Sequence, residues 1–283
     1  MVFPAAGLVA ALQIYPTLAG IWYAFHDIHL ARLHQMPFVG FGNFVRVLTG
    51  PFPNLVTPVA MATLVWVVGA VTLQMGVGLG LALLLQQTWV RGRDFLRSLY
   101  LFPWVISGIV VGYSWRFIFD PIVGLLNALL PAVGLAPRPW LTSAPLAMTA
   151  LLLAVTWRSA GYSLVLQMGG LQSIPSEVYE AARIDGAVGL RLLGHVVLPL
   201  IRPFLLINLI TTTVEALNAF DLVLALTRGG PLYRTEIVGL YMYHQGFQWG
   251  FLGNAAAVSV IVYAVATLLI LGYVRLLHER EAF

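Results

Sequence analysis

The residues best suited to chemistry lie in one polar stretch, residues 177–199, which reads EVYEAARIDGAVGLRLLGHVVLP between long apolar segments. Glu177, Glu180, Arg183 and Asp185 follow one another at intervals of two or three residues, so a short helix would expose all four to water. Carboxylates and a guanidinium presented in this way can form ion pairs with another protein. An ordinary solvated helix face is the alternative interpretation.

A second set of polar residues lies inside segments that are otherwise apolar. Thr211, Glu215 and Asn218 follow i, i+4, i+7 spacing and would share one stripe of a helix, and Asp221 comes three residues after Asn218. An ionisable group at membrane depth costs at least ~2.5–3.5 kcal/mol, so each should face a cavity or a partner. An earlier apolar segment carries a similar cluster, namely Trp157, Arg158, Ser159 and Tyr162.

The composition excludes several classes of catalysis. The chain has no lysine, so it can supply neither the phosphate-binding lysine of a P-loop ATPase nor a lysine Schiff base. It has no cysteine, hence no thiolate nucleophile or cysteine metal site, and its histidines show no metal-ligand spacing. We therefore expect neither an enzyme nor a metal site, and no nucleic-acid partner.

The elements that position these residues are predicted to be membrane helices. Of 283 residues, 60% are hydrophobic and 9% are charged, against about 25% charged in soluble domains. Each of six apolar runs is long enough to cross a hydrocarbon core of ~30 Å. The sequence predicts an all-α polytopic membrane protein whose six transmembrane helices run roughly over 3–25, 59–85, 96–119, 146–171, 200–226 and 251–277.

Arginines indicate the orientation of these helices. With both termini in the cytoplasm, eight arginines fall in inside segments and five in outside loops, in agreement with the positive-inside rule. The polar stretch then lies on the cytoplasmic side. Pro175 suits a helix start and Gly186 a helix end, which predicts a polar helix of about three turns, too short to span a bilayer.

Seven positions in this stretch resemble a known signature. Glu180, Ala181 and Ala182 are followed by Gly186 after three residues and by Val196, Leu198 and Pro199 after nine more. This pattern is similar to the EAA signature of bacterial ABC importer permeases, with valine replacing isoleucine at 196. The form EAARIDGA looks like the sugar-importer branch of maltose, trehalose and glycerol-phosphate type. The similarity extends to RSLYLFPW at 97–104 and NAFDLVLALTRGGP at 218–231.

The resemblance implies a type I importer permease fold in one transmembrane domain, residues 1–283, with a coupling loop at about 172–199. In this family the EAA helix docks in a cleft of a cytoplasmic ATPase, so Glu177, Glu180, Ala181, Ala182, Arg183, Asp185, Gly186, Leu198 and Pro199 are the expected coupling residues. The implied partners are a second homologous permease, two ATP-binding subunits that carry ATP and Mg, an extracytoplasmic solute-binding protein and the lipid bilayer. The implied location is the bacterial inner membrane.

The resemblance also assigns a role to the polar residues inside the spans. In the sugar branch Asn218 and Asp221 match cavity-lining positions, and Trp157, Arg158, Ser159 and Tyr162 fall near others. Amides and carboxylates bind paired sugar hydroxyls, and aromatic rings stack on apolar sugar faces. Hydrogen bonding between helices is the alternative use of both clusters.

Two other functions stay open at this point. The cargo could be glycerol-3-phosphate or another polyol, for which Arg158 would be the residue to test. The chain could instead be an ion-coupled secondary carrier that uses Glu215 or Asp221, although we find no inverted repeat.

Overall fold

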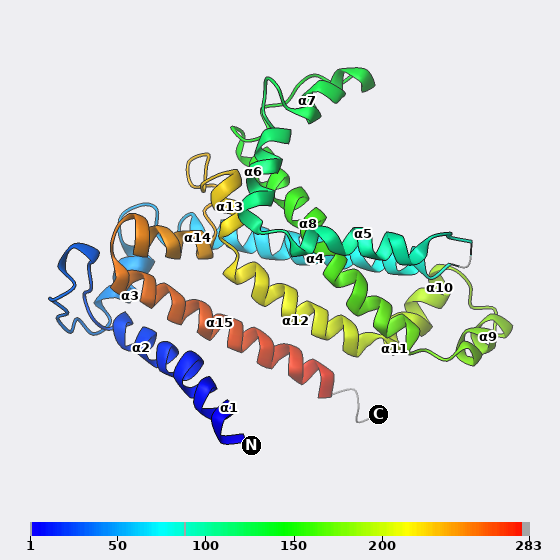
Figure 1. Cartoon of the computed structure of the whole chain (residues 1–283), viewed down its shortest axis with the longest axis horizontal. Coiled ribbons are helices and arrows are strands. Elements are labelled where there is room, and N and C mark those ends of the chain that lie inside the picture. The colour runs from blue at the N-terminus through cyan, green and yellow to red at the C-terminus, as the bar shows by residue number, and fades with distance from the viewer. Residues whose placement is uncertain (1, 88, 279–283) are drawn as a thin grey trace.

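Helices make up the chain because a membrane segment must satisfy its backbone polar groups internally. The computed structural model describes residues 2–87 and 89–278 (Figure 1). Within these residues no strand forms, and extended pairings are isolated bridges such as that between His26 and Phe38. The α-helices are α1 (Val2–Val9), α2 (Tyr15–Ala24), α3 (Gly42–Thr49), α4 (Val59–Leu85), α5 (Arg93–Val105), α6 (Gly108–Ile118), α7 (Leu125–Leu129), α8 (Ala144–Gln172), α9 (Ser176–Ile184), α10 (Leu190–Leu192), α11 (Leu198–Leu200), α12 (Arg202–Asn218), α13 (Asp221–Leu226), α14 (Val238–Tyr243) and α15 (Leu252–His278).

Four of the six predicted spans are continuous helical segments. They are Ala6–Ala24, Val59–Leu85, Ala144–Gln172 and Leu252–Arg275. The first joins α1 and α2 through a π turn at Ala10–Ile14. With each of two bent helix pairs counted as one span, the described residues provide up to six, as the sequence predicts.

The continuous course predicted for the third span is wrong. Instead of one helix over 96–119, α5 ends at Val105, α6 begins at Gly108, and the two meet at 99°. Pro103 lies inside the last turn of α5. Because proline offers no backbone N–H and clashes with the preceding turn, it favours a helix end nearby.

The fifth span is also interrupted. Helix α12 ends at Asn218 and α13 begins at Asp221, with two residues between them, so the predicted helix over 200–226 is not continuous. At its other end α12 meets the segment Leu190–Leu200 at an angle of 75°. Ile201, at this bend, is completely buried.

The core lies where α4, α8 and α12 meet. Helices α4 and α8 approach so closely at Gly78 that an added Cβ would lie only 2.5 Å from the Cβ of Ser163. Trp66 of α4 is fully buried, and its Nε1 donates a 3.0 Å hydrogen bond to the Ala216 carbonyl of α12. This bond fixes the part of α12 that precedes its break.

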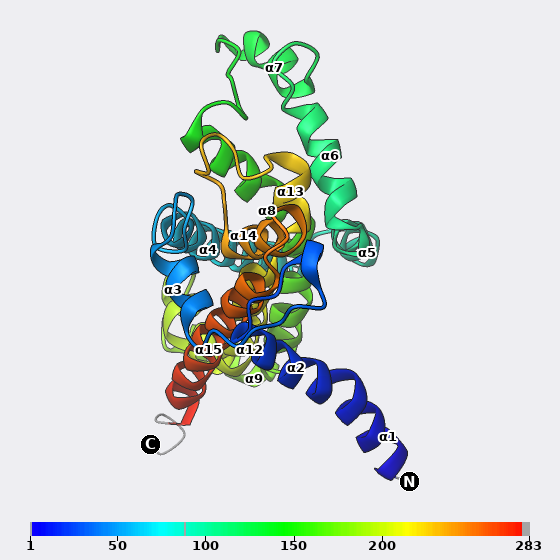
Figure 2. The same ribbon diagram turned by 90° about the vertical axis from the view of Figure 1, so that its left-hand side faces the viewer.

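The two ends of the bundle carry different elements. Helix α9 lies at one end of the molecule, and α13 and α14 lie away from it (Figure 1). The first span contacts the rest of the chain mainly through α15, and α1 extends away from the bundle (Figure 2). Its side chains from Ala6 to Leu18 are exposed, so this apolar helix has a wide surface for lipid or another subunit.

Candidate functional site

Helix α9 forms where the sequence predicts the coupling helix. It covers Ser176–Ile184, follows Pro175, and has Glu177 in its first turn and Arg183 in its last. These charges suit the two ends of the helix dipole. Gly186 follows with φ at +78°, a conformation that glycine adopts without steric cost, and the chain turns back there.

The charged residues predicted for coupling are exposed on α9 and at its end. Glu177, Glu180, Arg183 and Asp185 are all exposed, whereas Ala182 is 8% exposed and faces the protein. Of the other predicted coupling residues, Ala181, Gly186 and Pro199 are exposed and Leu198 is half-buried. The charged face is therefore available to another molecule.

Three apolar residues beside α9 were missed from the sequence. Ile184, Val188 and Leu190 have exposed fractions of 87%, 66% and 85%. Charged residues around exposed aliphatic side chains are typical of a protein-binding surface. Ile184 and Val188 are four residues apart, a helical spacing that predicts a shared face, so the spacing alone did not mark them as exposed.

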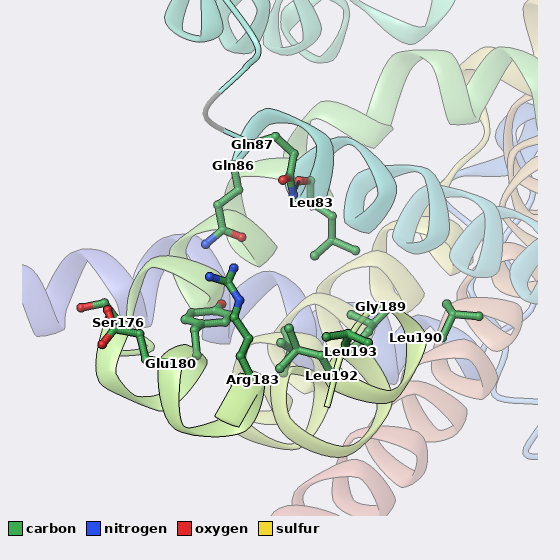
Figure 3. A pocket seen from close by; sticks show the side chains of 13 residues that line it. Leu83, Gln86, Gln87, Ser176, Glu180, Arg183, Gly189, Leu190, Leu192 and Leu193 are labelled. Carbon is green, nitrogen blue, oxygen red and sulfur yellow. Dashed lines mark hydrogen bonds between the residues drawn. The ribbon is translucent and has the colours of Figure 1, made fainter. Parts of the chain in front are cut away.

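A cavity of about 900 Å³ lies behind α9 (Figure 3). The end of α4 contributes Gln86 and Gln87 to one wall, and α9 contributes Glu180 and Arg183 to the opposite wall. The Arg183 guanidinium and the Gln86 amide extend toward each other across it (Figure 3). Its other polar groups are the hydroxyls of Ser176 and Tyr179, and the rest of the lining is mainly aliphatic, which suits contact with another protein.

The coupling loop continues directly into α12. After α9, the segment from Leu190 to Leu200 is helical with a π turn at Leu193–Val197, and it bends into α12 at Ile201. Val197 and Ile201 pack in one buried cluster with Leu164 and Leu171 of α8. After the largely exposed turn at 185–189, the connection to α12 therefore runs through packed side chains.

The stripe predicted on α12 faces out of the chain. Glu215 and Asn218 are exposed and Thr211 is half-buried. The Thr211 hydroxyl donates to Ile207 O at 2.9 Å, and the Asn218 amide donates to the carbonyl of Val214 at 2.9 Å, both within α12. These hydrogen bonds do not join α12 to another helix, so they do not support the helix–helix alternative for these two residues.

The cluster predicted on α8 is divided among different surroundings. Trp157 packs edge-on against Trp115 of α6 at 6.0 Å, and Tyr162 stacks on Trp104 of α5 at 5.4 Å between ring centroids. Ser159 is 4% exposed and points into the bundle. These three residues do not form a common polar wall.

Arg158 and Asp221 bracket the bend between α5 and α6. Arg158 Nε donates a 3.0 Å hydrogen bond to the Ile106 carbonyl, which follows the end of α5. The Asp221 carboxylate lies against Gly108, the first residue of α6. A cation at a helix C-terminus and an anion at a helix N-terminus both stabilise the helix dipole. The structure thus places these two predicted path residues at the bend, with the Arg158 charge also acting on the Glu215 carboxylate.

A buried polar group beyond α13 was missed from the sequence. Glu236 has no exposed surface, and its Oε1 lies 2.7 Å from His244 Nδ1. Next to them, Gln245 donates to the Tyr241 hydroxyl at 2.7 Å. Glu236 and His244 are eight residues apart and flank α14, a spacing without a recognisable period. Within the part of the chain that the structure describes, no three His, Cys, Asp or Glu side chains gather as a metal site.

Comparison with known proteins identifies the family. Residues 74–282 match the family described as binding-protein-dependent transport system inner membrane component. The trehalose/maltose transport system permease MalF of Thermococcus litoralis is 31% identical over 268 residues, covering 94% of this chain and 88% of that protein. The sn-glycerol-3-phosphate permease UgpA of Brucella abortus is 36% identical over 278 residues, covering 98% and 93%.

Solved structures share the fold. A bacterial alginate ABC transporter, in complex with an alginate pentasaccharide-bound periplasmic protein, contains a chain with a TM-score of 0.80 and 22% identity, covering 96% of this chain and 91% of that one. The chain belongs to the family of binding-protein-dependent transport system inner membrane components, and it is a transmembrane subunit of an ABC importer with the type I permease fold.

Proposed function

We propose that this subunit forms half of the translocation path for a mono-, di- or oligosaccharide and couples its import to ATP hydrolysis in a separate subunit. The observation that carries the proposal is the packed helical segment Leu190–Leu200, which follows α9 and bends into α12 at Ile201, because α12 presents Glu215 and Asn218 on an exposed stripe. Relatives whose names specify trehalose and maltose support a carbohydrate cargo.

The proposed assembly contains a second homologous permease, two copies of a cytoplasmic ATP-binding subunit and an extracytoplasmic solute-binding protein. ATP and Mg bind in the ATP-binding subunits, and the permease itself holds no cofactor. The exposed charged face of α9 and its aliphatic neighbours suit the contact with the ATPase. The periplasmic protein bound to the related alginate transporter supports a binding-protein partner.

We place the chain in the bacterial inner membrane as one domain, residues 1–283, with both termini cytoplasmic. The arginine distribution supports this orientation, with eight on the inside against five on the outside. It puts α9 on the cytoplasmic side, within reach of the ATPase.

The mechanism that follows is alternating access. When ATP closes the ATPase dimer, α9 moves, and the packed segment that ends at Ile201 transfers this movement to α12. The path then opens outward to accept the sugar, and hydrolysis returns it to the inward-facing state. The residues of this chain bind and orient the cargo and perform no covalent step.

Glycerol-3-phosphate is the second candidate cargo, favoured by the 36% identity to the Brucella abortus permease. A phosphate needs cationic donors in the path. Arg158 is the cation among the predicted path residues, and its Nε is already bonded to Ile106 O. The neighbouring Glu215 carboxylate further disfavours an anion. These contacts support a neutral sugar.

Co-purification in mild detergent tests the coupling role. Wild-type protein should bring down an ATPase and a second permease, and Glu180→Arg should lose the ATPase while keeping the permease. Arg32→Glu reverses an exposed charge outside the coupling loop and serves as the control. Retention of the ATPase by Glu180→Arg would contradict the role of this residue.

Uptake by the complete transporter in proteoliposomes tests the cargo. We expect ATP-dependent uptake of trehalose or maltose, and none of glycerol-3-phosphate. Uptake of the phosphate ester alone, lost on Arg158→Ala, would replace the sugar assignment. Uptake that requires an ion gradient and no ATP would favour a secondary carrier.

A further inference from the structure

A cavity lies beside the turn that follows α13, in a part of the molecule distant from α9 (Figure 1). Its volume of about 390 Å³ falls in the range typical of small-ligand pockets. We call it the outer cavity. Its polar and aromatic lining consists of Arg228, Tyr233, Tyr243, His244, Gln248 and Trp249.

A buried carboxylate orients the histidine of this cavity. Glu236 Oε1 lies 2.7 Å from His244 Nδ1, and neither side chain is more than 7% exposed. This hydrogen bond occupies Nδ1, so Nε2 is the ring nitrogen left to bond a ligand, and the imidazole that carries it lines the outer cavity.

The turn above Glu236 fixes two more lining residues. Arg228 and Tyr233 have φ angles of +54° and +59°, a region that non-glycine residues rarely adopt. The turn between them is held by the buried Thr235, whose hydroxyl donates to Gly230 O at 2.6 Å. Gly229 lies directly against the Glu236 carboxylate, because a Cβ added to Gly229 would be 3.2 Å from Cδ of Glu236. The backbone is thus constrained in a conformation that brings both side chains to the cavity.

These groups match the chemistry of a sugar ring. The free ring nitrogen of His244 can bond a hydroxyl group, Arg228 donates, and the Gln248 amide both donates and accepts, which suits adjacent hydroxyl groups. The rings of Trp249 and Tyr243 offer apolar faces for stacking. The Arg228 guanidinium at the rim and the Glu236 carboxyl group behind His244 oppose each other in charge, which suits a neutral ligand.

The outer cavity also borders the predicted path. Tyr243 lines it and stacks on Phe220 with 5.4 Å between centroids and 19° between planes. Phe220 lies in the break between α12 and α13, two residues from Asn218. A ligand leaving the cavity past this aromatic pair would reach the polar stripe of α12.

We propose that the outer cavity is a second, outward sugar site, which binds a neutral hydroxyl-rich ring before it reaches α12. This inference rests on the proposed carbohydrate function. A loop of another protein is the competing occupant, because Arg228 is exposed at the rim. The experiment below separates the two.

The absence of cysteine permits a site-directed protection assay. Gln248→Cys places an exposed thiol in the cavity, and Ile122→Cys places one at a residue 90% exposed in the loop after α6. The complete transporter with each variant, in nanodiscs without binding protein, is treated with a charged methanethiosulfonate. Modification rates are measured with and without trehalose or maltose, and glycine betaine controls for osmolarity.

We expect the sugar to slow modification of the thiol in Gln248→Cys and to leave the rate in Ile122→Cys unchanged. Adding Trp249→Ala to the Gln248→Cys variant should weaken this protection about two- to tenfold in apparent sugar affinity, the range for loss of one stacking contact.

Three other outcomes would contradict either the outer sugar site or the proposed transport function. Equal rates with and without sugar in Gln248→Cys, while the Ile122→Cys transporter takes up sugar in proteoliposomes supplied with binding protein and ATP, would overturn the outer site and leave the proposed function standing. Shielding of the cavity thiol by the binding protein alone would overturn the outer site too and assign the cavity to a protein loop. Absence of any sugar uptake would overturn the proposed function itself.

Discussion

Replacing Gly108 by alanine should strain the bend between α5 and α6. An added Cβ would lie 2.5 Å from Cγ and 2.7 Å from Oδ1 of Asp221, whereas ordinary contact begins at 3.4 Å. The carboxylate cannot simply rotate away, because Oδ1 also accepts a 2.8 Å hydrogen bond from the Leu222 amide. Helix α13 also packs closely on α6 at Gly112, where an added Cβ would lie 2.5 Å from Ala225 Cβ, so withdrawing α13 would lose this packing.

The size of the effect follows from two opposing contributions. Overpacking of a close contact costs about 1–3 kcal/mol. Alanine recovers up to about 1 kcal/mol over glycine in a helix, and less at the first residue of α6. The net loss in the free energy of unfolding is about 1–2 kcal/mol, which lowers Tm by roughly 2–6 °C for a chain of this size.

Thermal unfolding of the purified transporter measures this loss, and substitution of Asp221 identifies its cause. In an Asp221→Ala background the added methyl group has room, so Gly108→Ala should cost little there. Asp221→Asn keeps the volume of the carboxylate and should keep the cost. Gly76→Ala, in α4 with nothing within 4 Å of the new Cβ, is the matched control. An equal Tm decrease in the wild-type and Asp221→Ala backgrounds would refute the bracketing of the bend.

Three further changes test other parts of the structure. Trp66→Phe should lower the free energy of unfolding by about 1–3 kcal/mol, because the buried Ala216 carbonyl loses its hydrogen-bond donor. Thermal unfolding measures this loss, and Trp89→Phe, at an exposed tryptophan, is the control that should unfold like wild type. Gly186→Ala should lower the local stability of the coupling loop by about 1 kcal/mol, because alanine is strained at a φ of +78° while nothing lies within 4 Å of the new Cβ. Hydrogen exchange should be faster in this loop of the variant, and unchanged exchange would contradict the left-handed turn. The backbone N–H groups of Val123 and Ile122 donate to Asp120 and lower the pKa of its carboxyl group from 3.8. The stability that these hydrogen bonds confer is present above the pKa of Asp120 in the unfolded chain, and it is lost as pH falls through the lower pKa of the folded protein. Protection of those two amides, corrected for intrinsic exchange rates, should therefore disappear only below pH 3.8 in the wild type and stay independent of pH in Asp120→Asn.

Local signals were enough to predict the coupling helix. Pro175 and Gly186 act through the backbone of their own segment, and the observed helix lies between them. The apolar runs predicted where the membrane helices lie for a similar reason, since length and hydropathy are properties of each segment alone.

The breaks in the third and fifth spans depend on groups from other helices. Pro103 weakens α5 locally, but the carbonyl of Ile106 is free to leave the helix because Arg158, 52 residues later, donates to it. Similarly, Asp221 begins α13 against a glycine of α6. A pattern search along one segment cannot see such partners, so it extends the helix through the break.

The predicted path residues also fall into two groups, those placed by the spacing within one helix and those placed by contacts between helices. The stripe on α12 follows helical spacing, and the structure confirms that Thr211, Glu215 and Asn218 share one face. The roles of Arg158 and Asp221 at the bend arise from tertiary contacts, as does the pairing of Glu236 with His244. Whether these residues contact a transported sugar stays a prediction.

The bend at Ile201 has a geometric consequence for transport. Helix α12 has 17 residues, so at 1.5 Å per residue its far end lies about 25 Å from this pivot. As a rigid lever of that length, it would carry Asn218 sideways by about 4 Å for a rotation of roughly 10°. That distance is comparable with the thickness of a sugar ring. A small tilt imposed at the Ile201 end would be amplified into a change in the width of the path large enough to admit or exclude the cargo.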